Sequence, residues 1–294
     1  MIELLPMAII SGIMIGTIYG LIGIGMNIIY GVMRVVNFAH GEFMMLGAYL
    51  AFSISRHLGL NSIESIGVVL PAFFLLGVIL HHLLSERIQR SDDPELASFL
   101  IFFGISLIIT SLILLIWKAD PRSVAFPFER VSVVLGSIFL SMGRLISTGV
   151  CAAAIVMLSL FLYKTYTGKA IRAIIENREA VAILGIDVKR ISGLVFGIGL
   201  SAVAITGCLV TLSFPVITPV MGQTYTDIAF LVIVLGGLGT PLGALLGGVV
   251  YGLAESISAV FLPTALSPVV AFIILIFMVM VRPQGLLGRV TTRI

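Results

Sequence analysis

The polar side chains that could do chemistry in this chain are few, and the densest group lies between two apolar runs. The stretch MRVVNFAHGEF places Asn37, His40 and Glu42 around Gly41 with no long loop on either side. Histidine and glutamate can move protons or bind a polar solute, and an ionisable side chain inside an apolar run is a functional candidate. These residues could line a passage, pair with Arg34, or hydrogen-bond backbone groups freed where a helix breaks. They could equally sit at an interface and only hold the kink.

A second interruption, GGLGTPLG, divides the apolar run 228–258. As one straight helix that run would be about 45 Å long, against a hydrocarbon core of about 30 Å. Glycine and proline break helices, so we expect two segments. The candidate residues at this break are Gly236, Gly237, Gly239, Thr240 and Pro241. The stretches 35–51 and 234–250 resemble each other, which indicates either a parallel repeat that marks a substrate path or chance similarity between glycine-rich turns.

Other kinds of chemistry find little support in the sequence. His81 and His82 are adjacent and cannot share one helix face, and no His, Cys, Asp or Glu spacing is typical of a catalytic or metal site. The Gly168–Lys169 pair lacks the remaining residues of a phosphate-binding P-loop. We therefore expect no catalytic residue, no metal and no cofactor in this chain, and any ATP-driven work would need another chain.

Composition identifies the class of protein. The chain has 294 residues, of which 59% are hydrophobic and 11% charged, with a mean hydropathy of +1.20; soluble domains carry about 25% charged residues. The net charge of +3 comes from membrane-flanking loops, so no nucleic-acid partner is expected. Cys151 and Cys208 lie inside apolar runs and are expected to be buried. No cleavable signal peptide is evident, so the first helix should remain.

These patterns predict an all-α polytopic membrane protein with about eight or nine transmembrane segments, some broken or re-entrant, in a single domain over 1–294. The polar intervals between them include an external loop at about 118–140 with a short strand at 131–135, and a Pro/Gly loop at 213–227. The expected spans are 8–32, 43–55, 66–84, 96–117, 145–163, 191–212, the two parts of 228–258, and 265–281.

The longest polar interval, 164–190, carries six of the 17 basic residues and an apolar periodicity of three and four. Positive loops are retained in the cytoplasm, so we expect this helical loop and the C-terminus inside and the N-terminus outside. Its apolar face has nothing of its own to cover it, which indicates docking of a partner. The cations left outside are Arg56, Lys118, Arg122, Arg130 and Arg144.

Within this loop, Glu179 to Gly185 matches the Glu-Ala-Ala-x-x-x-Gly loop of bacterial ABC permeases, with Val181 for the second alanine. The runs VVNFAHGEFMMLGAY, RAIIENREAVAILGID, VLGGLGTPLGALLGGVVYGLAES and RPQGLLG follow in order along the chain. Together they resemble the LivH/LivM type of permease from branched-chain amino acid ABC importers, nearer LivH, over nearly the whole chain.

The resemblance implies a permease subunit in a bacterial inner membrane, with the C-terminus cytoplasmic. Its partners would be a second permease (LivM-like or a second copy), two cytoplasmic ATPases that bind ATP and Mg, and an extracytoplasmic binding protein. The cargo would be leucine, isoleucine or valine, moved by alternating access, although related permeases carry urea, short amides and other small organic solutes. The coupling residues would be Glu179, Ala180 and Gly185, with Arg172 and Arg178 nearby.

Two other classes remain open on the residues alone. An ion-coupled secondary transporter would need paired intramembrane acids, for which only Glu42 and Glu255 are candidates. A membrane-embedded enzyme would need a catalytic constellation, which the sequence does not offer.

Overall fold

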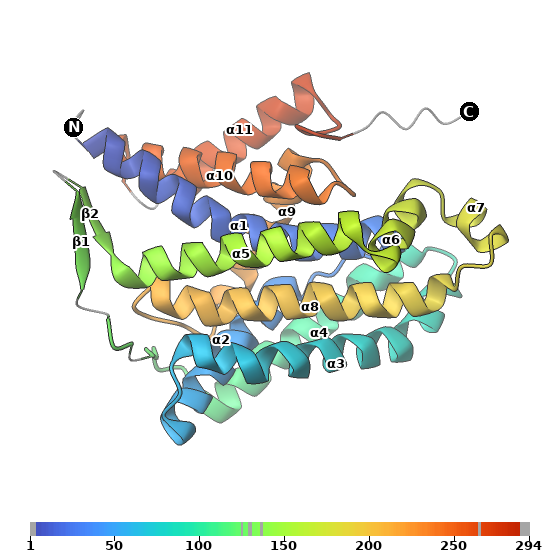
Figure 1. Ribbon diagram of the computed structural model, residues 1–294, viewed down its shortest axis with the longest axis horizontal. Coiled ribbons are helices and arrows are strands. Elements are labelled where there is room, and N and C mark those ends of the chain that lie inside the picture. The colour runs from blue at the N-terminus through green and yellow to red at the C-terminus, as the bar shows by residue number, and fades with distance from the viewer. Residues whose placement is uncertain (1–3, 125, 129–130, 136–137, 264–265, 289–294) are drawn as a thin grey trace.

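The computed structural model describes residues 4–124, 126–128, 131–135, 138–263 and 266–288. Helices dominate, and Figure 1 shows most of them running side by side along the long axis of the molecule. The predicted all-α class is confirmed. The N-terminal half contains α1 (Leu5–Met33), α2 (His40–Leu58), α3 (Ser62–Gln89), α4 (Pro94–Trp117), β1 (Ser132–Leu135) and β2 (Ile138–Ser141).

The C-terminal half contains α5 (Met142–Lys164), α6 (Tyr166–Glu176), α7 (Arg178–Ile183), α8 (Val188–Ser213), α9 (Met221–Gly236), α10 (Pro241–Phe261) and α11 (Ser267–Val281). Helix α1 starts at the same end of the bundle as the antiparallel β1–β2 hairpin, and α6 and α7 project at the other end (Figure 1). We call these the hairpin end and the loop end.

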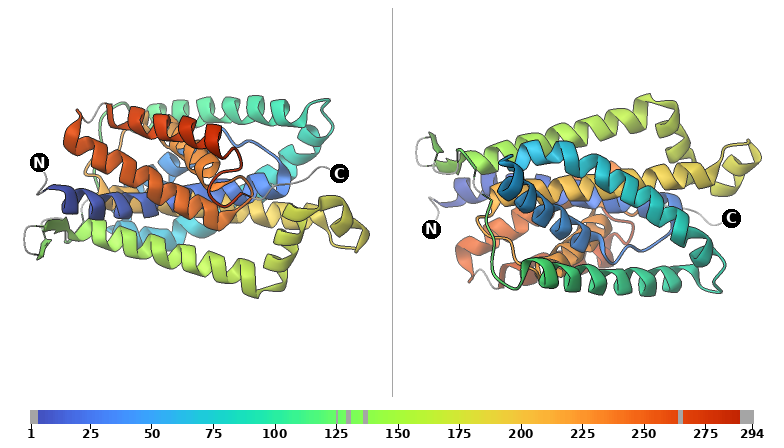
Figure 2. Two further views of the ribbon diagram at one scale, coloured as in Figure 1. Left: turned by 90° about the horizontal axis from the view of Figure 1, so that it is seen from above. Right: turned by 90° about the horizontal axis from the view of Figure 1, so that it is seen from below.

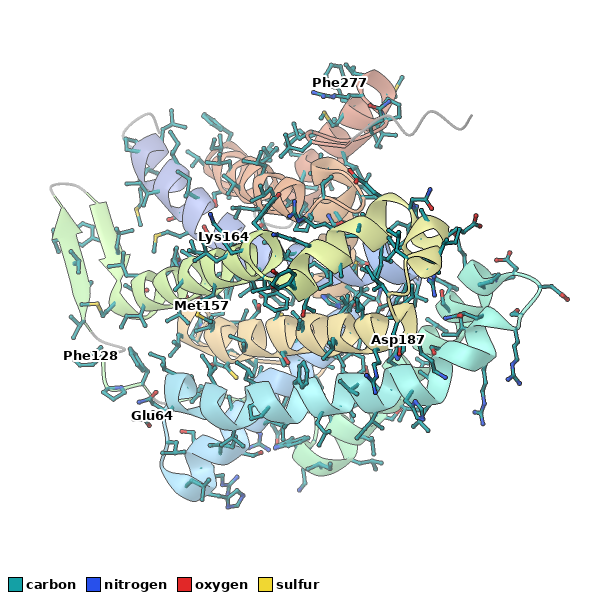
Figure 3. The ribbon with its side chains drawn as sticks, turned by 45° about the vertical axis from the view of Figure 1, so that its right-hand side comes forward. Glu64, Phe128, Met157, Lys164, Asp187 and Phe277 are labelled. Atoms are coloured by element: carbon teal, nitrogen blue, oxygen red, sulfur yellow. The ribbon has the colours of Figure 1, made fainter. Side chains whose placement is uncertain are left out.

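Six described helices are long and apolar enough to cross a membrane, namely α1, α3, α4, α5, α8 and α10. Helices α9 and α11 are apolar but shorter. Large apolar side chains project outward from the peripheral helices, such as Met157 on α5 (69% exposed) and Phe277 on α11 (67% exposed), both labelled in Figure 3. Such a surface suits lipid. The predicted number of eight or nine crossings remains a prediction.

The core forms around α1 and α8, which are the most buried of the six long helices, whereas α3, α4 and α5 are largely exposed. Figure 2 shows α5 on one side of the bundle and α4 and α11 on the opposite side. Helix α10 packs antiparallel along α1 through small residues: a Cβ at Gly16 would lie 2.7 Å from the carbonyl oxygen of Gly248. Small residues allow this close approach between membrane helices.

Helices α2 and α9 begin deep inside the bundle. After α1 ends at Met33, the chain turns back, and α2 starts at His40, whose Nε2 lies 3.1 Å from the carbonyl oxygen of Ile22. Ile22 is close to the middle of α1. An extended segment of six residues can span about 20 Å, enough for that return.

Two local expectations were incomplete or wrong. The strand expected at 131–135 is present as β1, but it pairs with a second strand, β2, that was not predicted. The loop expected at 213–227 is only 214–220, because α9 already begins at Met221. Its polar first turns looked like loop, yet Gly222 packs directly against Glu42 of α2. Arg130, one of the cations expected outside, and Arg289 and Arg293 of the C-terminal tail expected inside, lie outside the described residues.

Candidate functional site

The first break, between α1 and α2, is held by side chains. Asn37 Oδ1 accepts from the backbone N–H of Ala39 (3.1 Å), and Ser98 Oγ accepts from the backbone N–H of Val36 (3.1 Å). Arg34 takes a left-handed conformation with φ of 56° and stacks over the ring of Tyr30. Among the described residues, Arg34 forms no ion pair with Glu42.

The start of α2 is fastened to α9. Thr226 Oγ1 accepts from the N–H of Gly41 (2.8 Å) and donates to Glu42 Oε2 (3.0 Å). A Cβ at Gly41 would lie 2.0 Å from the carbonyl oxygen of Gly222, so only glycine fits there. The side chains of Asn37, His40, Glu42 and Thr226 are all at most 2% exposed. In this conformation they bond to one another or to backbone and present almost no surface to a solute.

The second break, between α9 and α10, is built mainly from backbone. Gly237 and Gly239 have φ of 108° and 77°, values that favour glycine. The buried Asn27 of α1 donates through Nδ2 to the carbonyls of Gly237 (3.0 Å) and Thr240 (3.2 Å). Pro241 opens α10.

Two further segments close over the second break. The tail returns to α9, where the N–H of Leu286 donates to the carbonyl of Leu235 (2.8 Å) and that of Leu287 to Gly236 (3.0 Å). From the loop end, Ile175 of α6 fills the space beside Gly31 and Gly239. The break is therefore in contact with both the tail and the projecting helices.

The projecting helices α6 and α7 have a packed side and an exposed side. Ile171 and Ile174 are buried against the bundle, whereas Tyr166, Ile183 and Leu184 are 91%, 87% and 78% exposed. Exposed large apolar side chains of this kind mark a contact surface for another molecule.

The five predicted coupling residues fall into two groups. Glu179 and Ala180 are exposed in the first turn of α7, which Asn177 caps by accepting from both of their N–H groups, and Gly185 closes the helix with φ of 80°. Arg172 and Arg178 instead reach back to the bundle, donating to the carbonyls of Leu162 (3.1 Å) and Val32 (3.4 Å). These last carbonyls lie near the loop ends of α5 and α1, where helix C=O groups lack partners.

Two important residues were missed or underrated in the sequence. Thr226 links the two halves of the chain but reads as an ordinary threonine in an expected loop. Asn27 supports the second break from a distant helix, and its only signal is an isolated amide within an apolar run. No group of three or more His, Cys, Asp or Glu side chains in the described part of the chain could hold a metal ion.

Comparisons with known proteins agree with this architecture. The family model described as "Branched-chain amino acid transport system / permease component" matches residues 8–279. The high-affinity branched-chain amino acid permease LivH of Salmonella typhimurium is 31% identical, with 95% of this chain and 94% of that protein covered. BraD of Pseudomonas aeruginosa is 30% identical over 96% and 95%. LivM of Escherichia coli is more distant, at 24% identity over 92% and 68%.

A solved structure shares the fold at low sequence identity. PsaBC from Streptococcus pneumoniae in complex with Fab superposes with a TM-score of 0.51 at 14% identity, covering 95% of this chain and 92% of that one. Family match, relatives and apolar helices together make this a multi-pass membrane protein of the importer type, nearer LivH than LivM. The chain belongs to the permease-component family of branched-chain amino acid transport systems.

Proposed function

We propose that this chain is the permease subunit of an ATP-driven importer in a bacterial inner membrane and that it carries leucine, isoleucine or valine by alternating access. The observation that carries the proposal is the pair of projecting helices, α6 and α7, whose outer side exposes the large side chains of Tyr166, Ile183 and Leu184 among charged residues. The relatives named above are permeases of branched-chain amino acid transport systems. Urea, short amides and other small organic solutes remain alternative cargoes on the same scaffold.

The loop end is the cytoplasmic end in this proposal, because basic loops stay inside. The described cations at the hairpin end are Arg56, Lys118, Arg122 and Arg144. Those at the loop end are Arg34, Arg87, Arg90, Lys164, Lys169, Arg172, Arg178, Lys189, Arg190 and Arg282. A reporter fused after Arg293 should therefore read cytoplasmic, and a periplasmic signal would reverse the orientation.

The energy comes from partners. Two cytoplasmic ATPase subunits bind ATP and Mg and dock on α7 around Glu179, Ala180 and Gly185. Their closure moves α6, and Ile175 and Arg178 pass that motion to the loop end of α1 and to the second break. A second permease, LivM-like or a second copy, completes the passage, and an extracytoplasmic binding protein delivers the solute at the hairpin end.

The docking step is tested by Ile183→Asp, which adds a charge to a side chain that is 87% exposed. Folding should be unaffected, but the ATPases should no longer co-purify and ATP-driven leucine uptake should be lost. The matched control is Leu58→Asp, on a 66% exposed leucine at the hairpin end, far from α7, which should keep the ATPases bound. Unchanged co-purification and uptake in Ile183→Asp would refute docking at α7.

A further inference from the structure

Helix α9 carries polar side chains on an outward surface that the two breaks do not use. Gln223, Thr224 and Asp227 are exposed, and Gln223 Nε2 donates to Asp227 Oδ1 (3.1 Å). Positions four apart lie on one face of a helix. We call these three residues the α9 polar face. By contrast, the polar residues of the first break are buried against their own chain.

Contacts with α1 show how deep in the membrane the α9 polar face lies. The ring of Tyr225 lies 6.3 Å from that of Tyr19, and Val232 packs against Gly23. Helix α1 covers Leu5–Met33, so both contacts are near its midpoint. At about 1.5 Å per residue, α1 is longer than a hydrocarbon core of about 30 Å, which places Asp227 well inside the apolar zone.

Lipid is a poor cover for this face. Exposed side chains in the middle of α4 and on α11 are apolar, for example Leu107, Ile108 and Phe277. A carboxylate at the same depth is costly unless it meets water, a cation or a cavity. Among the described residues, no cation forms an ion pair with Asp227, whereas Asp120 pairs with Arg122 and Asp187 with Arg190.

Polar groups continue from this face toward the hairpin end. The ring of Tyr19 meets those of Tyr225 and Tyr251 edge-on, at 6.3 and 5.5 Å, and its hydroxyl donates to Glu255 Oε2 (2.9 Å). Helix α10 runs antiparallel to α1, so Glu255 lies nearer the hairpin end than Tyr19 does. No described cation pairs with Glu255 either. Toward the loop end, α9 continues with the half-buried apolar Phe230 and Val234.

We infer that the α9 polar face, together with Tyr225 and Glu255, lines the solute passage from the hairpin end to half depth, with the buried Tyr19 holding Glu255 in place. Asp227 and Glu255 form no ion pair with any cation in the described part of the chain, so they accept the ammonium group of the solute, and Tyr225 lines the way between them. This inference rests on the proposed transport function and deepens it. If it holds, the passage favours solutes that carry an ammonium group over uncharged solutes such as urea.

The test is water access to Thr224→Cys in the assembled complex in membranes. Cys151 and Cys208 are buried, so the unmodified protein gives the background. The matched control is Leu107→Cys, which is exposed in the middle of α4. Thiols react as thiolates, which form in water and not in lipid, so a water-soluble methanethiosulfonate should modify Thr224→Cys at least about tenfold faster than Leu107→Cys.

Charge and solute sharpen the test. A cationic reagent should modify Thr224→Cys faster than an anionic reagent does, because the carboxylate of Asp227 is close by. Adding Asp227→Asn should reduce this difference in rate. Leucine should slow the labelling, while urea should not. Equal labelling rates at Thr224→Cys and Leu107→Cys would overturn the inference. A cross-link from Thr224→Cys to a neighbouring subunit, without labelling from water, would also overturn it. Protection by urea would overturn the assignment of the carboxylates to an ammonium group. Labelling needs no ATP, so loss of uptake alone would count against the proposed function and leave the passage in place.

Discussion

The two helix breaks satisfy their free backbone N–H and C=O groups in different ways. At the first break, side chains satisfy the freed backbone: Thr226 accepts from Gly41 and also donates to Glu42. At the second, glycines let backbone approach backbone, and one distant amide, Asn27, holds two carbonyls. Non-helical backbone is tolerated at membrane depth only where protein or water satisfies it. A break held by side chains depends on a few hydrogen bonds, whereas a break held by close packing depends on the absence of side chains.

Adding a methyl group at either break should have the largest effect. A Cβ at Gly41 would lie 2.0 Å from the carbonyl oxygen of Gly222, and one at Gly236 would lie 2.1 Å from that of Gly243. Backbone cannot yield as a side chain can, so Gly41→Ala and Gly236→Ala should each cost at least about 3 kcal/mol, the upper end for overpacking. The measurement is the temperature at which half the protein loses its monodisperse peak in detergent.

The controls for this prediction are Gly104→Ala and Gly149→Ala. Both glycines lie within helices and a Cβ there would meet nothing within 4 Å. Alanine favours a helix over glycine by about 1 kcal/mol, so both variants should be neutral or slightly more stable. A loss in the controls equal to that at the breaks would mean that close packing is not what holds the breaks.

Thr226→Val should come next, and it should affect only the first break. Valine keeps the shape but removes both the acceptor for Gly41 and the donor to Glu42, at a cost of about 1–3 kcal/mol for buried groups left unpaired. Thr206→Val is the matched control, because Thr206 is equally buried but bonds to Ala202 within its own helix. Equal melting shifts in the two variants would remove Thr226 from its role between α2 and α9.

Asn27→Leu should act on the second break alone. Two hydrogen bonds to the carbonyls of Gly237 and Thr240 are lost, and hydrogen bonds between membrane helices average about 0.6 kcal/mol, so the cost should be about 1 kcal/mol. Amide hydrogen exchange should rise around 237–240 and stay unchanged around 34–41. A rise at both breaks would show that they open together and would contradict their separate support.

Much of this arrangement could be predicted from the sequence, and the failures have a common cause. Glycine runs and Pro241 locate the second break because they act locally on the helix that contains them. The bond from Thr226 to Glu42 joins residues 184 apart, and nothing local reports it. For the same reason α9 was predicted to start too late: its polar first turns resemble a loop until their partners on α1 and α2 are known. Patterns predict elements, whereas buried polar pairs require the fold.

The smallest effect is expected for Thr240→Val. This variant tests most directly whether side-chain hydrogen bonds, as well as glycine packing, hold the second break. Thr240 Oγ1 donates to the carbonyl of Gly237 (2.7 Å), but that carbonyl also accepts from Asn27 Nδ2 (3.0 Å) and from the backbone N–H of Thr240 (3.3 Å). Removing one of these three donors leaves the acceptor satisfied, so the single variant should change stability by less than about 0.5 kcal/mol. Combined with Asn27→Leu, it leaves the carbonyl with only the longer bond from the backbone N–H of Thr240, and the cost of the double variant should exceed the sum of the two single costs by about 0.5 kcal/mol or more, as coupled neighbours do. Strict additivity in the double-mutant cycle would mean that glycine packing alone holds the second break and that Asn27 serves another purpose.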